Sequence, residues 1–131
     1  MKLALVGSRT YVNQKEFDEV VDAFVLKHGT LPELVVSGGA RGADTLAEVW
    51  ARKHKVPLKI FKPDWKAKGK AAGVLRNTDI VNECTHMIAF PAADGKGTQD
   101  SIKKAQGKGI PVEIHWKRMQ EPVERSLFRF N

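Results

Sequence analysis

The clearest chemical signal in the chain is a glycine-rich segment, Ser37-Gly38-Gly39-Ala40-Arg41-Gly42-Ala43-Asp44. Adjacent glycines let backbone N–H groups approach a phosphate closely, and a helix that begins after them offers the positive end of its dipole. Arg41 could add a bidentate contact to the same anion. We therefore predict a phosphate site here, with a ligand-free strand-to-helix turn as the alternative. Asp44 falls in the first turn of the helix, where a carboxylate could cap the turn instead of contacting a ligand.

A second segment, Gly95-Lys96-Gly97-Thr98, has related chemistry. It combines small residues, a cation and a hydroxyl at a predicted helix start, where Thr98 would be the N-cap. Two such loops at one edge of a sheet could hold a single ligand between them. The first, glycine-rich segment matches neither the GxGxxG nor the GxxxxGK[ST] pattern, so neither NAD binding nor ATP hydrolysis follows from it.

Further polar and aromatic candidates follow other predicted strands. They are Gly7-Ser8-Arg9, Asp64-Trp65, Lys70, and the pair Arg76 and Asn77. The three cations would balance the charge of a bound phosphate, and Trp65 could stack on a base. The alternatives are a solvated helix face for Arg76 and Asn77 and a tryptophan packed under its loop.

The elements that must position these residues alternate along the chain. Short apolar runs predict strands at 3–6, 34–36, 58–61, 87–90 and 110–114, and Pro111 indicates that the last lies at a sheet edge. Helices are predicted between Asn13 and Gly29, after the glycine-rich segment, at about 71–82, and from Thr98 to about Gly107. In the second of these helices, one face carries Ala43, Leu46, Ala47, Trp50 and Ala51. For the helix at 71–82 we predict an inner face of Val74, Leu75, Thr78 and Val81.

Alternating strands and helices predict a Rossmann-like α/β fold, a three-layer sandwich with a mainly parallel five-stranded sheet. We expect residues 1–114 to form this one domain, with the strand at 3–6 in its centre. Residues 115–131 are expected to be a C-terminal tail that docks on the domain, pairs with another subunit in a homo-oligomer, or stays mobile. Ligands of such sheets bind beyond the carboxyl ends of the strands, near the point where strand order reverses.

Composition narrows the class of partner. The 131 residues carry a formal charge of +7, which favours anionic partners, and Lys62, Lys66, Lys68, Lys70 and Arg76 concentrate positive charge. The alternative for this run is a solvated basic loop.

Several other classes are not favoured by the sequence. One cysteine, Cys84, and scattered histidines offer no ligand spacing, so we predict no metal site and no cofactor. A reducing, cytoplasmic location is expected, without membrane association, because no signal segment or apolar span is evident. No Ser/His/Asp pattern accompanies Ser8 or Ser37, so a serine hydrolase is not supported.

The motifs taken together resemble the YspA/YpsA-related branch of the SLOG superfamily. The resemblance runs from about Lys2 to Ile114 and is carried by the segments at 7–9, 37–44, 64–65, 69–73, 76–77 and 97–98. It implies a Rossmann-like fold and ligands related to nucleotides or nucleic acid. Members of the superfamily include the DNA-processing protein DprA and the LOG phosphoribohydrolases, which cleave the N-glycosidic bond of nucleoside monophosphates.

The chain departs from the LOG enzymes at one position. Their PGGxGTxxE pattern ends in a catalytic glutamate, whereas here Ser101 stands at that place. A serine cannot stabilise an oxocarbenium-like centre as a carboxylate does, so Asp94 or Asp100 would have to substitute.

Three functions follow as hypotheses. The first is binding of a nucleotide or nucleotide-derived phosphate ligand, as a sensor or an enzyme. The second is N-glycosidic hydrolysis of a nucleoside 5′-monophosphate, and the third is binding of single-stranded nucleic acid.

Overall fold

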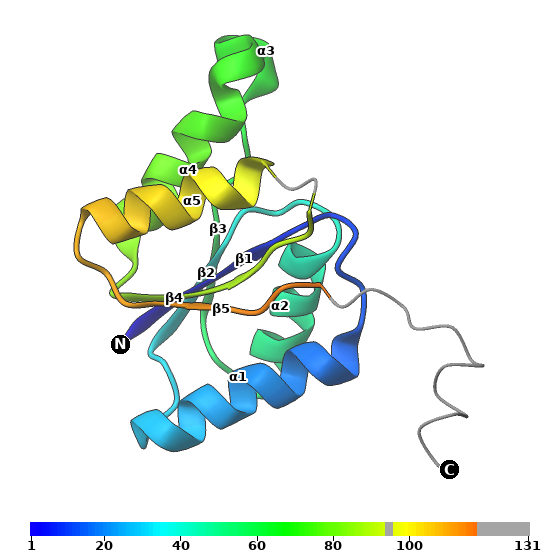
Figure 1. Cartoon of the computed structure of the whole chain (residues 1–131), viewed down its shortest axis with the longest axis vertical. Coiled ribbons are helices and arrows are strands. Elements are labelled where there is room, and N and C mark those ends of the chain that lie inside the picture. Colours follow the sequence, from blue (N-terminus) through cyan, green and yellow to red (C-terminus); the bar gives the residue numbers. More distant parts are fainter. Residues whose placement is uncertain (94–95, 118–131) are drawn as a thin grey trace.

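The computed structural model describes residues 1–93 and 96–117 and contains one five-stranded sheet with helices on both faces (Figure 1). The strands are β1 (Lys2–Gly7), β2 (Leu34–Ser37), β3 (Leu58–Ile60), β4 (His86–Phe90) and β5 (Val112–Ile114). The helices are α1 (Gln14–His28), α2 (Ala43–Lys53), α3 (Trp65–Lys68), the 3₁₀ turn η1 (Gly69–Ala71), α4 (Ala72–Glu83) and α5 (Lys96–Gly107).

The strand order is β3-β2-β1-β4-β5 and every pairing is parallel. The prediction of a mainly parallel Rossmann-like sheet is therefore confirmed, as are the central place of β1 and the edge position of β5. The chain winds outward from β1 through β2 to β3, then crosses back to place β4 on the other side of β1. The point where strand order reverses consequently lies between β1 and β4, at their carboxyl ends.

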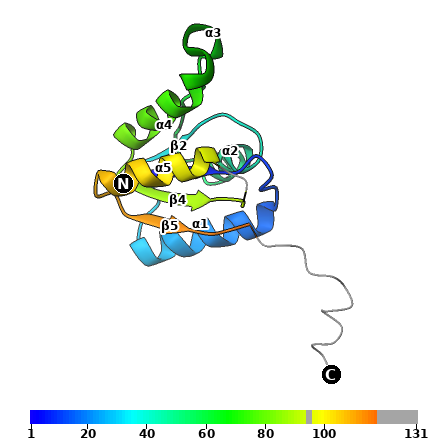
Figure 2. The same ribbon diagram turned by 45° about the horizontal axis from the view of Figure 1, so that its top comes forward.

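Both faces of the central strand are buried, which explains its unbroken apolar sequence. Leu3 and Leu5 pack in a cluster with side chains of α1 and α2, whereas Ala4 and Val6 pack in a second cluster with side chains of α4 and α5. Figure 1 shows α1 and α2 on one face of the sheet and α4 and α5 on the other, and Figure 2 shows α1 and α5 on opposite sides of β4.

Local signals fix the first two helices. The Asn13 side chain caps α1 by accepting from the Glu16 amide at 3.1 Å, and Gly29 ends the helix with φ of 99°. The predicted inner face of α2 is confirmed. Its members are all buried: Ala43, Leu46, Ala47, Trp50 and Ala51.

The predicted inner face of α4 is wrong except for Val81. Val74 and Leu75 are 49% and 43% exposed, and Thr78 is only partly buried. The helix instead turns inward a face whose buried members are Ala72, Asn77, Ile80 and Val81. The polar Asn77 finds hydrogen-bond partners on α5, so its burial carries no unpaired amide, and an apolar pattern alone could not reveal this.

Two further boundaries differ from the predictions. Helix α5 begins at Lys96, so Thr98 is a buried residue of its first turn and not its N-cap. The basic segment after β3 is not an open loop, because residues 65–71 form α3 and η1. The Asp64 carboxylate caps α3 by accepting from the Ala67 amide at 3.1 Å. A helix this short leaves no periodicity for sequence reasoning to detect.

The predicted tail begins in contact with the domain. The amides of His115 and Lys117 donate to the carbonyls of Ala89 and Pro91, at 2.8 Å each, so the chain runs on beside β4 after β5 ends. The rest of the predicted tail, 118–131, lies outside the described residues.

Candidate ligand-binding site

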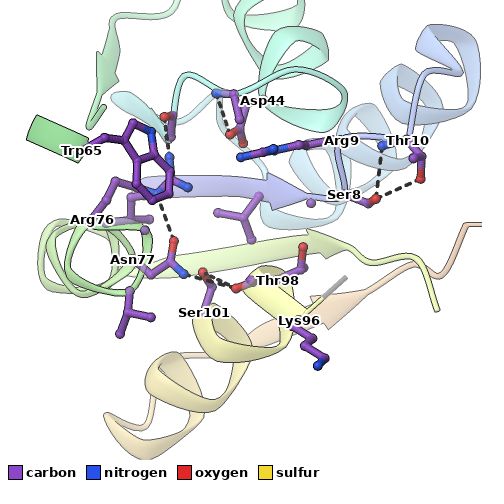
Figure 3. Close-up of a pocket in the computed structure, with 18 of the residues that line it drawn as sticks. Ser8, Arg9, Thr10, Asp44, Trp65, Arg76, Asn77, Lys96, Thr98 and Ser101 are labelled. Carbon is purple, nitrogen blue, oxygen red and sulfur yellow. Dashed lines mark hydrogen bonds between the residues drawn. The ribbon is translucent and has the colours of Figure 1, made fainter. Parts of the chain in front are cut away.

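A cavity of about 530 Å³ opens at the carboxyl ends of the strands, at the point where strand order reverses (Figure 3). We call it the switch-point cavity. Its walls come from the β1–α1 loop, the β2–α2 loop, α3 and η1, α4, and the first turns of α5. The lining residues are Val6, Gly7, Ser8, Arg9, Thr10, Gly38, Ala40, Asp44, Trp65, Lys70, Gly73, Val74, Arg76, Asn77, Ile80, Lys96, Gly97, Thr98 and Ser101.

Most of the candidate residues from the sequence meet in this cavity. Those lining it are Gly7, Ser8, Arg9, Gly38, Asp44, Trp65, Lys70, Arg76, Asn77, Gly97 and Thr98. Five others do not line it: Ser37, Gly39, Arg41, Gly42 and Asp64. Ser37 is buried at the end of β2, Arg41 is exposed, and Asp64 caps α3. Ligand contacts by these five stay predictions.

The glycine-rich segment is built largely around contacts within the protein. The Ala40 amide donates to the Asp44 carboxylate at 3.0 Å, and the Ala43 amide donates to the Ser8 carbonyl at 3.1 Å. Gly42 lies so close to the β1–α1 loop that a Cβ atom there would be 2.3 Å from the Ser8 carbonyl oxygen. The Ala40 and Ala43 amides are therefore already engaged, and Gly42 packs against the β1–α1 loop. Phosphate binding by the amides of Gly38, Gly39 and Gly42 stays a prediction.

Asp44 and Arg76 form the electrostatic centre of the cavity wall. Burial raises the pKa of the Asp44 carboxyl, while the Ala40 amide and the charge of Arg76 act in the opposite direction. Burial likewise lowers the pKa of Arg76; the Asp44 carboxylate opposes this effect and the positive charge of Arg9 adds to it. The Arg76 guanidinium donates to the Gly38 carbonyl from Nη1 and to the Asn77 side chain from Nε, the latter at 3.0 Å.

Asn77 joins the two halves of the site. Its Oδ1 accepts from Arg76, and its Nδ2 donates to the Gly97 carbonyl and to the Asp100 carboxylate, at 3.2 Å each. The chain of bonds links the β2–α2 loop through α4 to the first turn of α5 (Figure 3). Asn77 is only 5% exposed, so its own amide relies on these protein partners and not on water.

Asp94 and Asp100 are the two carboxylates that the sequence offers for catalysis. The Asp100 carboxylate is held by Asn77 and by the Lys104 ammonium at 3.0 Å, and it does not line the switch-point cavity. Asp94 lies outside the described residues. Ser101 lines the cavity and is 2% exposed.

Sequence reasoning missed several lining residues. Thr10 binds the Ser8 hydroxyl, its Oγ1 lying 2.9 Å from Ser8 Oγ, and Ala40, Gly73 and Val74 complete the walls. The sequence does contain a signal for Ser101. It lies four residues after Gly97 and three after Thr98, so on a helix it shares a face with both of these candidate residues.

Charge in the cavity is strongly unbalanced. Arg9, Lys70, Arg76 and Lys96 line it, whereas Asp44 is the single carboxylate among the described lining residues. The first turn of α5 adds the positive end of a twelve-residue helix. The arrangement therefore favours an anionic ligand.

Within the described part of the chain, no cluster of His, Cys, Asp and Glu side chains is placed to hold a metal ion. Over the same residues, no helix combines the length and apolar character needed to cross a membrane.

Fold and cavity together define an open Rossmann-like domain with a polar cavity at its switch point. Residues 1–67 match the family described as the YspA, cpYpsA-related SLOG family. The gene 61 protein of Mycobacterium phage D29 is 36% identical over 119 residues, which cover 85% of this chain and 93% of that protein. The chain belongs to the YspA, cpYpsA-related SLOG family.

Solved structures share the fold at low sequence identity. DNA processing protein A from Helicobacter pylori, described with its single-stranded DNA binding mode, has a TM-score of 0.67 at 18% identity over 99% of this chain and 73% of its own. DprA from Streptococcus pneumoniae has a TM-score of 0.71 at 19% identity over 98% of this chain, which spans 56% of that protein. The structure of TM1055 has a TM-score of 0.58 at 15% identity and covers 98% of both chains.

Proposed function

We propose that the chain binds a nucleotide or nucleotide-derived phosphate ligand in the switch-point cavity. The observation that carries the proposal is the group of cationic side chains around one buried carboxylate, beside the first turn of a helix. Arg9 and Arg76 are close enough for the charge of one to lower the pKa of the other. A bound dianion would relieve this repulsion and supply the missing negative charge.

We place the phosphate against the first turn of α5, which lines the same cavity as Arg9. Backbone N–H groups at a helix start are available to anions, whereas the Ala40 and Ala43 amides already have acceptors. Arg76 is held by Gly38 and Asn77, so it contributes charge from a fixed position. The glycine-rich segment then forms a wall of the site.

Isothermal titration with nucleoside monophosphates, ADP-ribose, NAD and cyclic nucleotides tests the proposal. Arg9→Gln should weaken the tightest ligand by about 10- to 100-fold, the value of a hydrogen bond to a charged group. Arg52→Gln is the matched control, because Arg52 is 74% exposed and pairs with Glu48 on the surface of α2. Absence of binding by every ligand of the panel would overturn the proposal. A selective loss in Arg41→Gln would move the phosphate back to the glycine-rich segment.

Single-stranded nucleic acid is the second candidate partner. The basic segment with α3 and η1 projects beyond the layers of the sandwich and carries Lys66, Lys68 and Lys70 next to the half-exposed Trp65 (Figure 1). Cations interleaved with an aromatic ring are typical of single-strand binding. Fluorescence anisotropy with a labelled oligothymidine should show affinity falling steeply between about 50 and 200 mM salt. A response that does not change with salt would reject this function.

Hydrolysis of a nucleoside 5′-monophosphate is the least supported of the three functions. It needs a carboxylate at the sugar. Of its two candidates, Asp100 is bound to Asn77 and Lys104 and does not line the cavity, and Asp94 lies outside the described residues. We therefore place binding ahead of hydrolysis. Chromatographic detection of free base from nucleoside monophosphates would reverse that order.

A further inference from the structure

Trp65 presents a large aromatic surface to the switch-point cavity. Its side chain lines the cavity and 52% of the residue is exposed, although an indole ring normally packs away from water. Trp50, by contrast, is fully buried and its Nε1 donates to Asp22 at 2.9 Å. The sequence left open whether Trp65 packs under its loop, and the structure excludes that arrangement.

The short helix α3, which carries Trp65, is capped at both ends. Asp64 caps its start, and the Gly69 amide donates to the Trp65 carbonyl at its end. Across the cavity wall, Gly73 on α4 offers no side chain, and a Cβ atom there would be 3.6 Å from Cη2 of Trp65. The edge of the indole therefore rests over Gly73, with the half-exposed Val74 also lining the cavity.

The cavity thus has two chemically different ends. One is largely apolar, made of Trp65, Gly73 and Val74, and the other is the first turn of α5, while Arg9 and Arg76 line the cavity as well. Figure 3 shows Trp65 and Thr98 in different parts of the cavity wall, with Asn77 between them and Arg9 extending toward Asp44. A ligand that satisfies both ends has an aromatic ring and an anionic group in one molecule.

We infer that Trp65 is the stacking platform for the base of the ligand, so that the site selects nucleotides over sugar phosphates and inorganic phosphate. The inference rests on the proposed function, since it assigns the second half of the same site. Every base has a π-face, so stacking on Trp65 selects for a base without naming which one.

Titration of the native protein with AMP, GMP, CMP, UMP and ribose 5-phosphate tests the inference. The tightest of the four nucleotides should bind about 5- to 100-fold more tightly than ribose 5-phosphate, which is the contribution of one stacked base. Trp65→Leu should weaken that nucleotide by a similar factor and leave ribose 5-phosphate unchanged, while Trp65→Phe should keep most of the preference.

The outcomes separate the two proposals. If ribose 5-phosphate binds as tightly as every nucleotide, or Trp65→Leu weakens both ligands equally, the platform is rejected and the anion site stands. If no phosphate ligand binds, the proposed function falls and the platform with it.

Tryptophan fluorescence gives an independent readout. In a Trp116→Phe background, nucleotide should quench the emission of Trp65, because the other described tryptophan, Trp50, is buried away from the ligand. Ribose 5-phosphate should leave the emission unchanged. Equal quenching when Trp65 is replaced by Phe would contradict the assignment.

Discussion

The close contact between Gly42 and the β1–α1 loop predicts a large loss of stability in Gly42→Ala. Gly42 has φ of 74° and ψ of −129°, a backbone conformation that costs a side-chain-bearing residue about 1–3 kcal/mol. The new Cβ would lie 2.3 Å from the Ser8 carbonyl oxygen and 2.5 Å from the Arg9 carbonyl carbon. Moving that backbone adds about 1–3 kcal/mol, as in overpacked cores.

The two effects together predict a decrease of about 2–6 kcal/mol in the free energy of unfolding, a large part of the roughly 5–15 kcal/mol of a typical domain. Urea unfolding followed by circular dichroism measures it. No ligand is added, so a lost phosphate contact cannot account for the change.

Gly97→Ala is the matched control. A Cβ atom on Gly97 meets nothing within 4 Å, and the residue lies in the first turn of α5. Alanine there should be neutral or stabilising by up to about 1 kcal/mol, since it restricts the unfolded chain. A Gly42→Ala protein within about 0.5 kcal/mol of the native one would refute the packing of the two loops.

Three further predictions concern buried polar groups. Asn77→Ala should lower the free energy of unfolding in urea titrations by about 2–4 kcal/mol, because Arg76, Gly97 and Asp100 all lose a hydrogen-bond partner. A decrease below about 1 kcal/mol would contradict a stabilising role for the Asn77 hydrogen bonds. The raised pKa of Asp44 means that the folded state favours the protonated carboxyl. The stability that Asp44 gives the folded protein is therefore fully present below the ordinary pKa of 3.8, and it is lost as pH rises through the folded pKa. Unfolding measured across pH should therefore show Asp44→Asn gaining stability relative to the native protein as pH rises above about 4, and a constant difference would contradict it. Burial raises the pKa of the Cys84 thiol to about 11. Iodoacetamide at pH 8 should therefore alkylate Cys84 much more slowly in the folded protein than in urea, as mass spectrometry would show. Equal alkylation rates would contradict the burial of this thiol.

The sheet could be predicted because its signals are local. Apolar runs such as Leu3 to Val6 end at glycine turns, and Pro111 marked the edge strand before any pairing was known. Loops that follow parallel strands lie at the same edge of the sheet, which is why most candidate loops meet in one cavity. The full strand order could not be predicted, because it depends on which strands pair across the sheet.

The use of each residue could not be predicted where its partner lies far along the chain. The sequence places Gly42 in a glycine-rich loop, but it does not show that the Ser8–Arg9 backbone, and not a phosphate, occupies the space beside that residue. The inner face of α4 was misassigned for the same reason. Burial of Asn77 depends on partners in α5, and periodicity counts a polar residue as exposed.

The position of β4 beside β1 also has a consequence for how the molecule folds. Lys2 and Thr85, which are bonded at the start of this pairing, are 83 residues apart in the chain. Loop closure over such a distance is slow compared with the pairing of neighbours in sequence, so β1, β2 and β3 can associate while β4 is still unpaired. Until β4 docks, the apolar flank of β1 is open to solvent and to other chains. Completion of the switch-point cavity and protection of the nascent domain against aggregation are then the same late event.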